Sequence, residues 1–167
     1  MKVHYSSETN EWATPQDLYD KLDEEFNFTL DPCATDKNAK CDKYYTIKEN
    51  GLIQDWSKDV VFMNPPYGRE IKHWVLKAYL ESKRGAIVVC LIPSRTDTRY
   101  WHDYIFPYAE IRFLKNRMYF KNQDNEGDRA PFPSAVVVFD KNKENKKIYG
   151  WDVYFTEQCS AQLDLGV

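Results

Sequence analysis

The tetrapeptide Asn64-Pro65-Pro66-Tyr67 constrains this chain of 167 residues more than any other stretch. The apolar run 60–63 before it is typical of a buried strand. After it, apolar residues recur at helical spacing on one face. The tetrapeptide is therefore predicted to join a strand to a helix at the carboxyl end of the strand. In open α/β sheets this edge is where ligands bind.

The residue types in this loop suit the binding of an amino group. Pro65 and Pro66 have a fixed φ and no N–H, and Asn64, which precedes a proline, is held extended. The Asn64 side-chain oxygen and the Pro65 carbonyl can then point at one spot as two acceptors. Such a pair favours a pyramidal amine with a free lone pair, and Tyr67 offers a flat face on which a base can stack. The alternative is a proline-rich turn with a core tyrosine.

In this setting the tetrapeptide resembles motif IV of the amino-methyltransferases. These enzymes transfer a methyl group from S-adenosylmethionine to the exocyclic amine of adenine or cytosine, or to a glutamine side-chain amide. The resemblance implies that Asn64, Pro65, Pro66 and Tyr67 are catalytic.

Length and composition favour one globular domain, with 43% hydrophobic residues. No stretch resembles a signal peptide, and no apolar run reaches the length of a membrane span, so we expect a cytoplasmic protein without membrane attachment. The four cysteines are widely spaced and are not clustered with histidines, which predicts reduced thiols and no metal site.

Charge is distributed unevenly along the chain. The net charge is −3 overall, but residues 1–64 carry −6 and residues 65–121 carry +6. The basic block thus begins directly after the tetrapeptide. A basic stripe beside a base-sized pocket suits contacts with nucleic-acid phosphates. The alternative is mixed surface charge that solvates helices.

A helix start precedes the first predicted strand. Thr14 is a good N-cap and Pro15 a good first helical residue, and apolar residues recur every fourth position over 18–26. This start resembles motif X, which packs against the cofactor in these enzymes. The resemblance makes Thr14, Pro15 and the neighbouring Trp12 cofactor-binding candidates.

Asp31-Pro32-Cys33 ends a short predicted strand and resembles motif I, which surrounds the methionine part of the cofactor. The loop glycines of that motif are missing, and the polar stretch 35–40 stands in their place. The alternative for Asp31 is an Asx turn that ends the strand. Asp55 resembles the motif III aspartate, which accepts a hydrogen bond from the adenine of the cofactor.

The second half of the chain predicts further strands. The apolar run 85–93 is typical of a parallel strand buried on both faces. Strands are also predicted at 109–114, 135–139 and within 148–155, whereas the Asn-, Asp- and Gly-rich stretch 121–129 is predicted to be a mobile loop.

Five residues in this half are substrate-binding candidates. Arg95 and Arg99 follow the strand 85–93, and Lys115 and Arg117 follow the strand 109–114. Their cationic side chains suit phosphate contacts. Phe132 precedes a late strand and resembles motif VIII, which offers the target base a second flat face. The alternative for Phe132 is a core side chain between prolines.

The run as a whole is similar to the phage-type DNA N-6-adenine methyltransferases. The resemblance covers about residues 11–139. It rests on the tetrapeptide and on four longer strings: Glu11-Trp12-x-Thr14-Pro15, Asn38-Ala39-Lys40-Cys41, Pro93-x-Arg95-Thr96-Asp97-Thr98 and Ala130-Pro131-Phe132-Pro133-Ser134. The resemblance implies a bacteriophage or prophage origin, S-adenosylmethionine as cofactor and DNA as partner.

These observations predict a three-layer α/β methyltransferase fold of the Rossmann-like kind, with a mainly parallel sheet and an antiparallel C-terminal strand. Residues 1–10 are predicted to be a flexible start, 11–155 the methyltransferase domain and 156–167 a tail. The expected reaction is methylation of the 6-amino group of adenine in DNA. Three alternatives stay open: an RNA adenine, a protein glutamine, or a non-catalytic nucleic-acid-binding module that has lost its cofactor.

Overall fold

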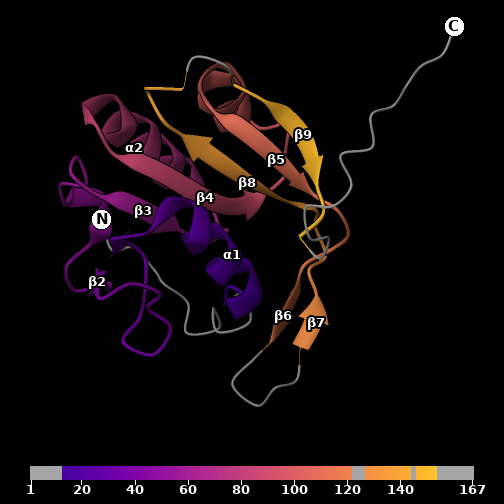
Figure 1. Cartoon of the computed structure of the whole chain (residues 1–167), viewed down its shortest axis with the longest axis horizontal. Helices are drawn as coiled ribbons and strands as arrows, with labels where there is room; N and C mark the ends of the chain where they lie inside the picture. The colour runs from indigo at the N-terminus through magenta and orange to yellow at the C-terminus, as the bar shows by residue number, and fades with distance from the viewer. Residues whose placement is uncertain (1–12, 122–126, 144–145, 154–167) are drawn as a thin grey trace, which may run out of the picture.

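The computed structural model describes residues 13–121, 127–143 and 146–153, and its centre is one seven-stranded sheet (Figure 1). The strands lie in the order β2-β1-β3-β4-β8-β5-β9. In that order they are Lys43–Tyr44, Leu30–Asp31, Val60–Met63, Ile87–Pro93, Ser134–Phe139, Glu110–Leu114 and Ile148–Trp151. A separate hairpin pairs β6 (Tyr119–Lys121) with β7 (Gly127–Arg129).

The sheet runs in one direction except for β8. Strands β2, β1, β3 and β4 pair in parallel, as do β5 and β9, whereas β8 is antiparallel to both of its neighbours, β4 and β5. The predicted Rossmann-like α/β fold is therefore confirmed. The antiparallel strand is β8, inside the sheet, whereas the last strand of the described chain, β9, is parallel to β5. The predicted flexible start and tail lie outside the described residues.

Helices cover both faces of the sheet and make three layers. Helix α1 (Gln16–Phe26) buries Leu18, Tyr19 and Leu22 against one face. On the other face lie α2 (Ile71–Arg84), the π-helical segment η3 (Trp101–Ile105) and the short α3 (Phe106–Tyr108). Strands β4 and β8 are buried on both faces, which explains their continuous apolar sequences. No helix in the described part of the chain is long and apolar enough to cross a membrane.

A buried ion-pair cluster fixes α1 on the sheet. Arg112 of β5 donates two hydrogen bonds of 2.6 Å to the Glu25 carboxylate of α1 and a third, of 2.8 Å, to Glu110. The bidentate geometry sets both the position and the rotation of the helix. The segment before α1 is thereby held over the carboxyl ends of the parallel strands.

The strand order reverses between β1 and β3. From β1 the chain moves outward to β2, and from β3 it moves the other way to β4. Such a switch point leaves a crevice outside the carboxyl ends of the two strands, where α/β proteins bind ligands. Asp31 ends β1 and Asn64 directly follows β3, so two sequence-predicted site residues flank the switch point.

Two local predictions are wrong. Helix α1 begins at Gln16, with Pro15 at the N-cap position, and the Thr14 side chain does not cap the helix. The predicted loop 121–129 is not continuous, because its ends belong to the β6–β7 hairpin. The sequence signal was weak there because Gly, Asn and Asp are depleted in strands, and cross-strand pairing overrides that preference.

The 3-10 helix η2 (Gly51–Ile53) packs against the backbone of the turn after β1. Gly51 is buried, and a Cβ atom at this position would overlap the Pro32 carbonyl oxygen. The Gly51 carbonyl in turn accepts a hydrogen bond of 3.0 Å from the Trp56 indole, so η2 cannot move away freely. A glycine is therefore required for the close approach of the two backbones.

We predict that Gly51→Ala lowers the free energy of unfolding by about 1–3 kcal/mol, because the new methyl group must displace backbone. Urea denaturation followed by circular dichroism measures this loss. Gly150→Ala is the matched control, since a Cβ at Gly150 meets nothing within 4 Å. Equal stability of the two variants would contradict the close approach.

Candidate active site

The Asn-Pro-Pro-Tyr loop (residues 64–67) lies between β3 and α2, as predicted. Met63 at the end of β3 is fully buried, and Ile71 at the start of α2 anchors the other end of the loop in the same core. Asn64 and Tyr67 are half-buried, so their side chains lie between the core and the surface. The edge of the sheet thus presents the loop in a fixed position.

The Asn64 amide is held at both of its ends. Its Nδ2 donates a hydrogen bond of 2.9 Å to Thr14 Oγ1, and its Oδ1 accepts one of 2.6 Å from the Tyr67 hydroxyl. Thr14 lies just before α1 and is 7% exposed. An amide held by an acceptor at nitrogen and a donor at oxygen has only one favourable orientation. A carbonyl oxygen has two lone pairs and can therefore accept a second hydrogen bond beside that of Tyr67.

The Tyr67 side chain takes part in this hydrogen-bond network through its hydroxyl group. Its hydroxyl also lies 3.3 Å from the Leu91 carbonyl of β4, and burial raises the pKa of Tyr67 far above its usual value. The hydroxyl therefore stays protonated and can act as a donor at neutral pH. The Tyr67 ring meets the Phe132 ring edge to face, with centroids 5.5 Å apart and planes at 84°.

Arg95 and Phe132 complete this side of the site. The Arg95 guanidinium lies 5.8 Å from the Phe132 ring centroid, and its Nη1 donates a hydrogen bond of 3.4 Å to the Tyr67 carbonyl. The Ser94 N–H donates to the Pro133 carbonyl at 2.8 Å, which ties the end of β4 to the segment before β8. Because β8 is antiparallel, Phe132 reaches the same edge of the sheet as the Asn-Pro-Pro-Tyr loop.

Asp31 occupies the other side of the switch point. Its carboxylate accepts hydrogen bonds from the backbone N–H of Cys33 (3.4 Å) and of Lys40 (3.2 Å), and no cation in the described part of the chain forms an ion pair with it. Burial raises the pKa of Asp31 to about 6. The Cys33 bond has the form of an Asx turn. A buried carboxylate whose nearest cation, Lys40, lowers its pKa less than burial raises it also suits a cationic ligand.

The stretch 35–40, which replaces the expected glycine loop, folds onto Asp31. The Thr35 N–H donates to the Asn38 side chain at 2.7 Å, and the Asn38 N–H returns to the Thr35 side chain at 3.3 Å. This closed turn brings the Lys40 N–H to the Asp31 carboxylate. Two polar side chains therefore organise the backbone here where glycines would otherwise give it freedom.

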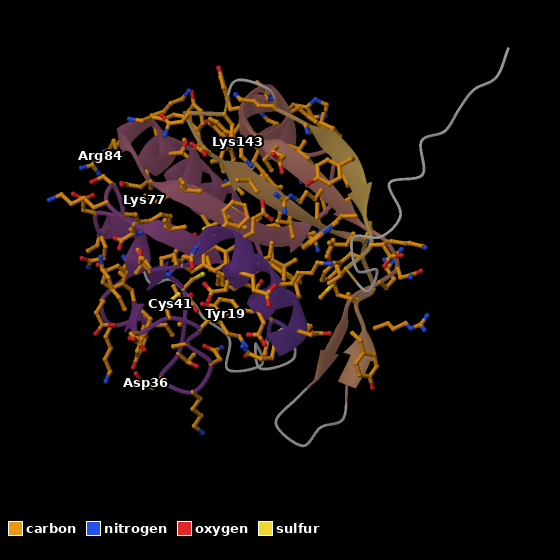
Figure 2. The ribbon with its side chains drawn as sticks, in the orientation of Figure 1. Tyr19, Asp36, Cys41, Lys77, Arg84 and Lys143 are labelled. Carbon is orange, nitrogen blue, oxygen red and sulfur yellow. The ribbon has the colours of Figure 1, made fainter. Side chains whose placement is uncertain are left out.

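The two turns at the switch point touch each other. The Asn64 backbone N–H donates a hydrogen bond to the Cys33 sulfur. This bond lowers the pKa of the thiol, but burial has the larger effect and raises the pKa well above its usual value. Helix α1 contacts the same region, since the Tyr19 hydroxyl lies 3.5 Å from Cys41 Sγ (Figure 2). The structure thus brings Thr14, Asp31, Cys33 and Asn64 to one place.

Asp55 is not at this edge of the sheet. It precedes β3, its side chain is 63% exposed, and it forms an ion pair of 3.2 Å with Arg84 at the end of α2 (Figure 2). The Ser57 N–H and hydroxyl, together with Arg84, lower the pKa of Asp55 to about 2. Spacing along the chain suggested the motif III position, but the chain between β2 and β3 places Asp55 at the amino ends of the strands.

The other candidates are dispersed. Arg99 is exposed and lies 3.7 Å from Asp103, and Lys115 pairs with Asp152 at 2.9 Å. Arg117 is exposed at the base of the β6–β7 hairpin. Trp12 lies outside the described residues. No group of three or more His, Cys, Asp or Glu side chains in the described ranges could hold a metal ion.

Sequence reasoning missed the bond between Thr14 and Asn64. A threonine before a helix predicts an N-cap, and no local pattern indicates that its hydroxyl is used 50 residues away instead. The available signal was Pro15, whose missing N–H reduces the need for a cap at the helix start.

We predict that Thr14→Val lowers the free energy of unfolding by about 1–3 kcal/mol, because the Asn64 Nδ2 group loses its acceptor while the side-chain volume is kept. Thr14→Ser, which keeps the hydroxyl, should lose less. Urea titration of both variants measures the difference. The reverse order, with Thr14→Ser the weaker variant, would show that packing rather than the hydrogen bond matters.

Comparisons with known proteins indicate a family for this chain. A family model described as DNA N-6-adenine-methyltransferase (Dam) matches residues 3–157. The "DNA N-6-adenine-methyltransferase" of Escherichia phage T1 is 28% identical over 106 residues, which cover 62% of this chain and 44% of the phage protein. The "Putative methyltransferase YfdM" of Escherichia coli (strain K12) is 38% identical over 65 residues, covering 35% of this chain and 71% of the relative.

The aligned part thus spans less than half the length of the phage relative. The family model, in contrast, extends over both turns of the switch point and over the strands on either side. Because this model matches most of the chain, the chain belongs to the DNA N-6-adenine-methyltransferase (Dam) family.

Proposed function

We propose that this protein transfers a methyl group from S-adenosylmethionine to the 6-amino group of adenine in DNA. The observation that carries the proposal is the Asn64 amide, which is held at both ends at the carboxyl end of β3, beside Tyr67 and Phe132. Membership of the Dam family supports DNA as the substrate class. A protein that acts on DNA in a bacterial cell works in the cytoplasm.

The residues at the switch point fit the cofactor. Asp31 is a buried carboxylate with two long backbone hydrogen bonds. Lys40 attracts it electrostatically, but in the described part of the chain no cation forms an ion pair with it within 4 Å. The ammonium group of the methionine part of S-adenosylmethionine would supply the missing positive charge. When bound, S-adenosylmethionine supplies a methyl group on a positively charged sulfur.

Further contacts with the cofactor are proposed from position. We propose Pro32 and Cys33, which directly follow Asp31, and Thr14 and Pro15, since Thr14 contacts Asn64 across the switch point. Trp12 remains a sequence-based candidate. For the ribose we propose Glu49, because dinucleotide folds place a ribose-binding carboxylate about 20 residues past the first turn. Glu49 follows β2 at the same edge of the sheet as Asp31. Asp55 lies at the opposite edge, where it pairs with Arg84.

The Asn-Pro-Pro-Tyr loop would bind the target amine. Asn64 Oδ1 and the Pro65 carbonyl accept its two hydrogens, which draws the nitrogen toward a pyramidal geometry and frees its lone pair. Thr14 and Tyr67 hold the Asn64 amide in the required orientation beforehand, and preorganised groups of this kind need no rearrangement during the reaction. The amine needs no general base before the attack, because it loses its proton after it gains the methyl group.

The target adenine must leave the base stack to reach this loop. The Tyr67 and Phe132 rings stand at 84° to each other, so a base that stacks on the face of one ring meets the edge of the other. Arg95, which lies over Phe132, is placed to contact the phosphate beside the extruded nucleotide. Arg99, Lys115 and Arg117 remain proposals for phosphate contacts farther away.

The reaction itself is tested by incubating the protein with adenine-containing duplex DNA and S-adenosylmethionine. The digested nucleosides are then identified by mass spectrometry. We expect N6-methyladenine. Methylcytosine alone, or product only on RNA or on protein glutamine, would overturn the proposal in favour of one of the other amine substrates.

We predict that Asn64→Ala lowers turnover by about two to three orders of magnitude, because an acceptor used mainly as the amine becomes pyramidal is lost. Affinity for S-adenosylmethionine, measured by calorimetry, should stay near normal. Asn142→Ala is the control, since this exposed asparagine lies in the turn after β8 at the opposite edge. Normal turnover in Asn64→Ala would make Asn64 only a turn residue.

We also predict that affinity for S-adenosylmethionine falls about tenfold per pH unit below pH 6. The pKa of Asp31 is raised to about 6, so the carboxyl is protonated and uncharged below this value, and a bound ammonium requires the ionised form. Above pH 6 the affinity should level off.

Calorimetry of Asp31→Asn should show weaker binding without this pH dependence between pH 5 and 7. Asp55→Asn is the matched control on the opposite edge and should bind as the unaltered protein does. A pH dependence that survives in Asp31→Asn would assign the titration to another group.

A further inference from the structure

The β6–β7 hairpin is not used by the proposed chemistry, yet it emerges at the active-site edge. It lies between the carboxyl end of β5 and the amino end of β8. Both ends lie at the edge where β3 and β4 finish, because β8 is antiparallel to β4 and β5. Figure 1 shows the two strands extending away from the seven-stranded sheet. Only two residues separate β7 from Phe132.

The base of the hairpin has one buried face and one exposed face. Met118 is 7% exposed and Ala130 is 2% exposed, both belong to the core beneath α1, and the Ala130 N–H donates to the Met118 carbonyl at 2.7 Å. Tyr119 pairs directly with Arg129 in the next position of the ladder. Since side chains alternate along a strand, Tyr119 and Arg129 share the opposite face.

This second face is open to solvent and cationic. Tyr119 is 45% exposed, and Arg129 and Arg117 are also exposed. In the described ranges no carboxylate forms an ion pair with either arginine. A solvent-exposed aromatic ring opposite one arginine in the ladder, with a second exposed arginine two residues before it, has the chemistry that contacts phosphates and base edges. We call these three residues the arm face.

Duplex DNA fits the arm face better than an acidic protein does. A two-stranded β-ribbon has the width to enter the major groove, where arginine binds guanine or phosphate. Two residues separate the arm face from Phe132 in the chain, and both lie at the same edge of the sheet, so a duplex whose adenine enters the proposed base-binding site can reach the arm face.

We propose that the arm face, formed by Arg117, Tyr119 and Arg129, binds the DNA duplex beside the target adenine and contributes to the choice of methylation site. This inference rests on the proposed function, since it assigns the flanking duplex to the same DNA substrate.

The test measures DNA binding apart from methylation. Fluorescence anisotropy of a labelled random-sequence duplex should show about tenfold weaker binding for Tyr119→Ala, because the contact of the ring with base edges in the groove is lost. Tyr119→Phe keeps the ring and should restore most of the affinity. Arg129→Ala and Arg117→Ala should each weaken binding and flatten the slope of log affinity against log salt by about one unit.

Lys58→Ala is the matched control, because this exposed lysine lies before β3 at the opposite edge. Its binding and salt slope should equal those of the unaltered protein. Thermal unfolding verifies that each arm variant is folded. Among variants that methylate, sequencing of methylated sites in a random duplex pool should show a broader preference.

The two proposals fail in different ways. If the unaltered protein binds duplex DNA but yields no N6-methyladenine, the proposed function fails while the binding comparison still tests the arm face. If all three arm variants keep the affinity and salt slope of the unaltered protein, the arm face does not contact DNA. Capture of an acidic protein partner by the arm face without any DNA contact overturns it as well.

Discussion

The hydrogen bonds of the Asn64 amide and of the Tyr67 hydroxyl connect the segments on which the active site depends. Thr14 comes from the start of α1, Asn64 and Tyr67 from the loop after β3, and the Leu91 carbonyl from β4. Together these hydrogen bonds join α1, the loop after β3 and β4 at one edge of the sheet. Displacement of α1 would therefore change the orientation of the catalytic amide, and the Arg112–Glu25 pair, which holds α1, stabilises the site from a distance.

Two buried charged side chains of this protein, Arg112 and Asp31, differ in how far their charges are compensated by neighbouring groups. Arg112 is surrounded by Glu25 and Glu110, and these hydrogen bonds keep its pKa raised despite burial. Asp31 accepts hydrogen bonds from backbone N–H groups and is attracted by Lys40 without forming an ion pair, so burial dominates and raises the pKa of its carboxyl. A satisfied pair fixes a structure, whereas an uncompensated charge costs free energy that a ligand of opposite charge can recover. The contrast separates a structural cluster from a proposed ligand site.

The single antiparallel strand decides what surrounds the proposed target base. Because β8 runs against its neighbours, the segment before it enters at the edge where β3 and β4 end, and Phe132 meets Tyr67 and Arg95 there. The β6–β7 hairpin leaves from the same edge for the same reason. A parallel β8 would place both features at the far edge, beside Asp55. The catalytic loop and the proposed DNA contacts are thus joined by topology.

The sequence by itself determined the strand–loop–helix context of Asn64, the buried strands and the α/β class, because these follow from local periodicity and from the fixed geometry of proline. It also identified Tyr67 and Phe132 as ring candidates. Only the tertiary structure decided that Thr14 binds Asn64 and that Asp55 lies at the opposite edge. Contacts between residues distant in sequence depend on strand order and on how helices pack, and neither quantity is encoded in the spacing of residues along the chain.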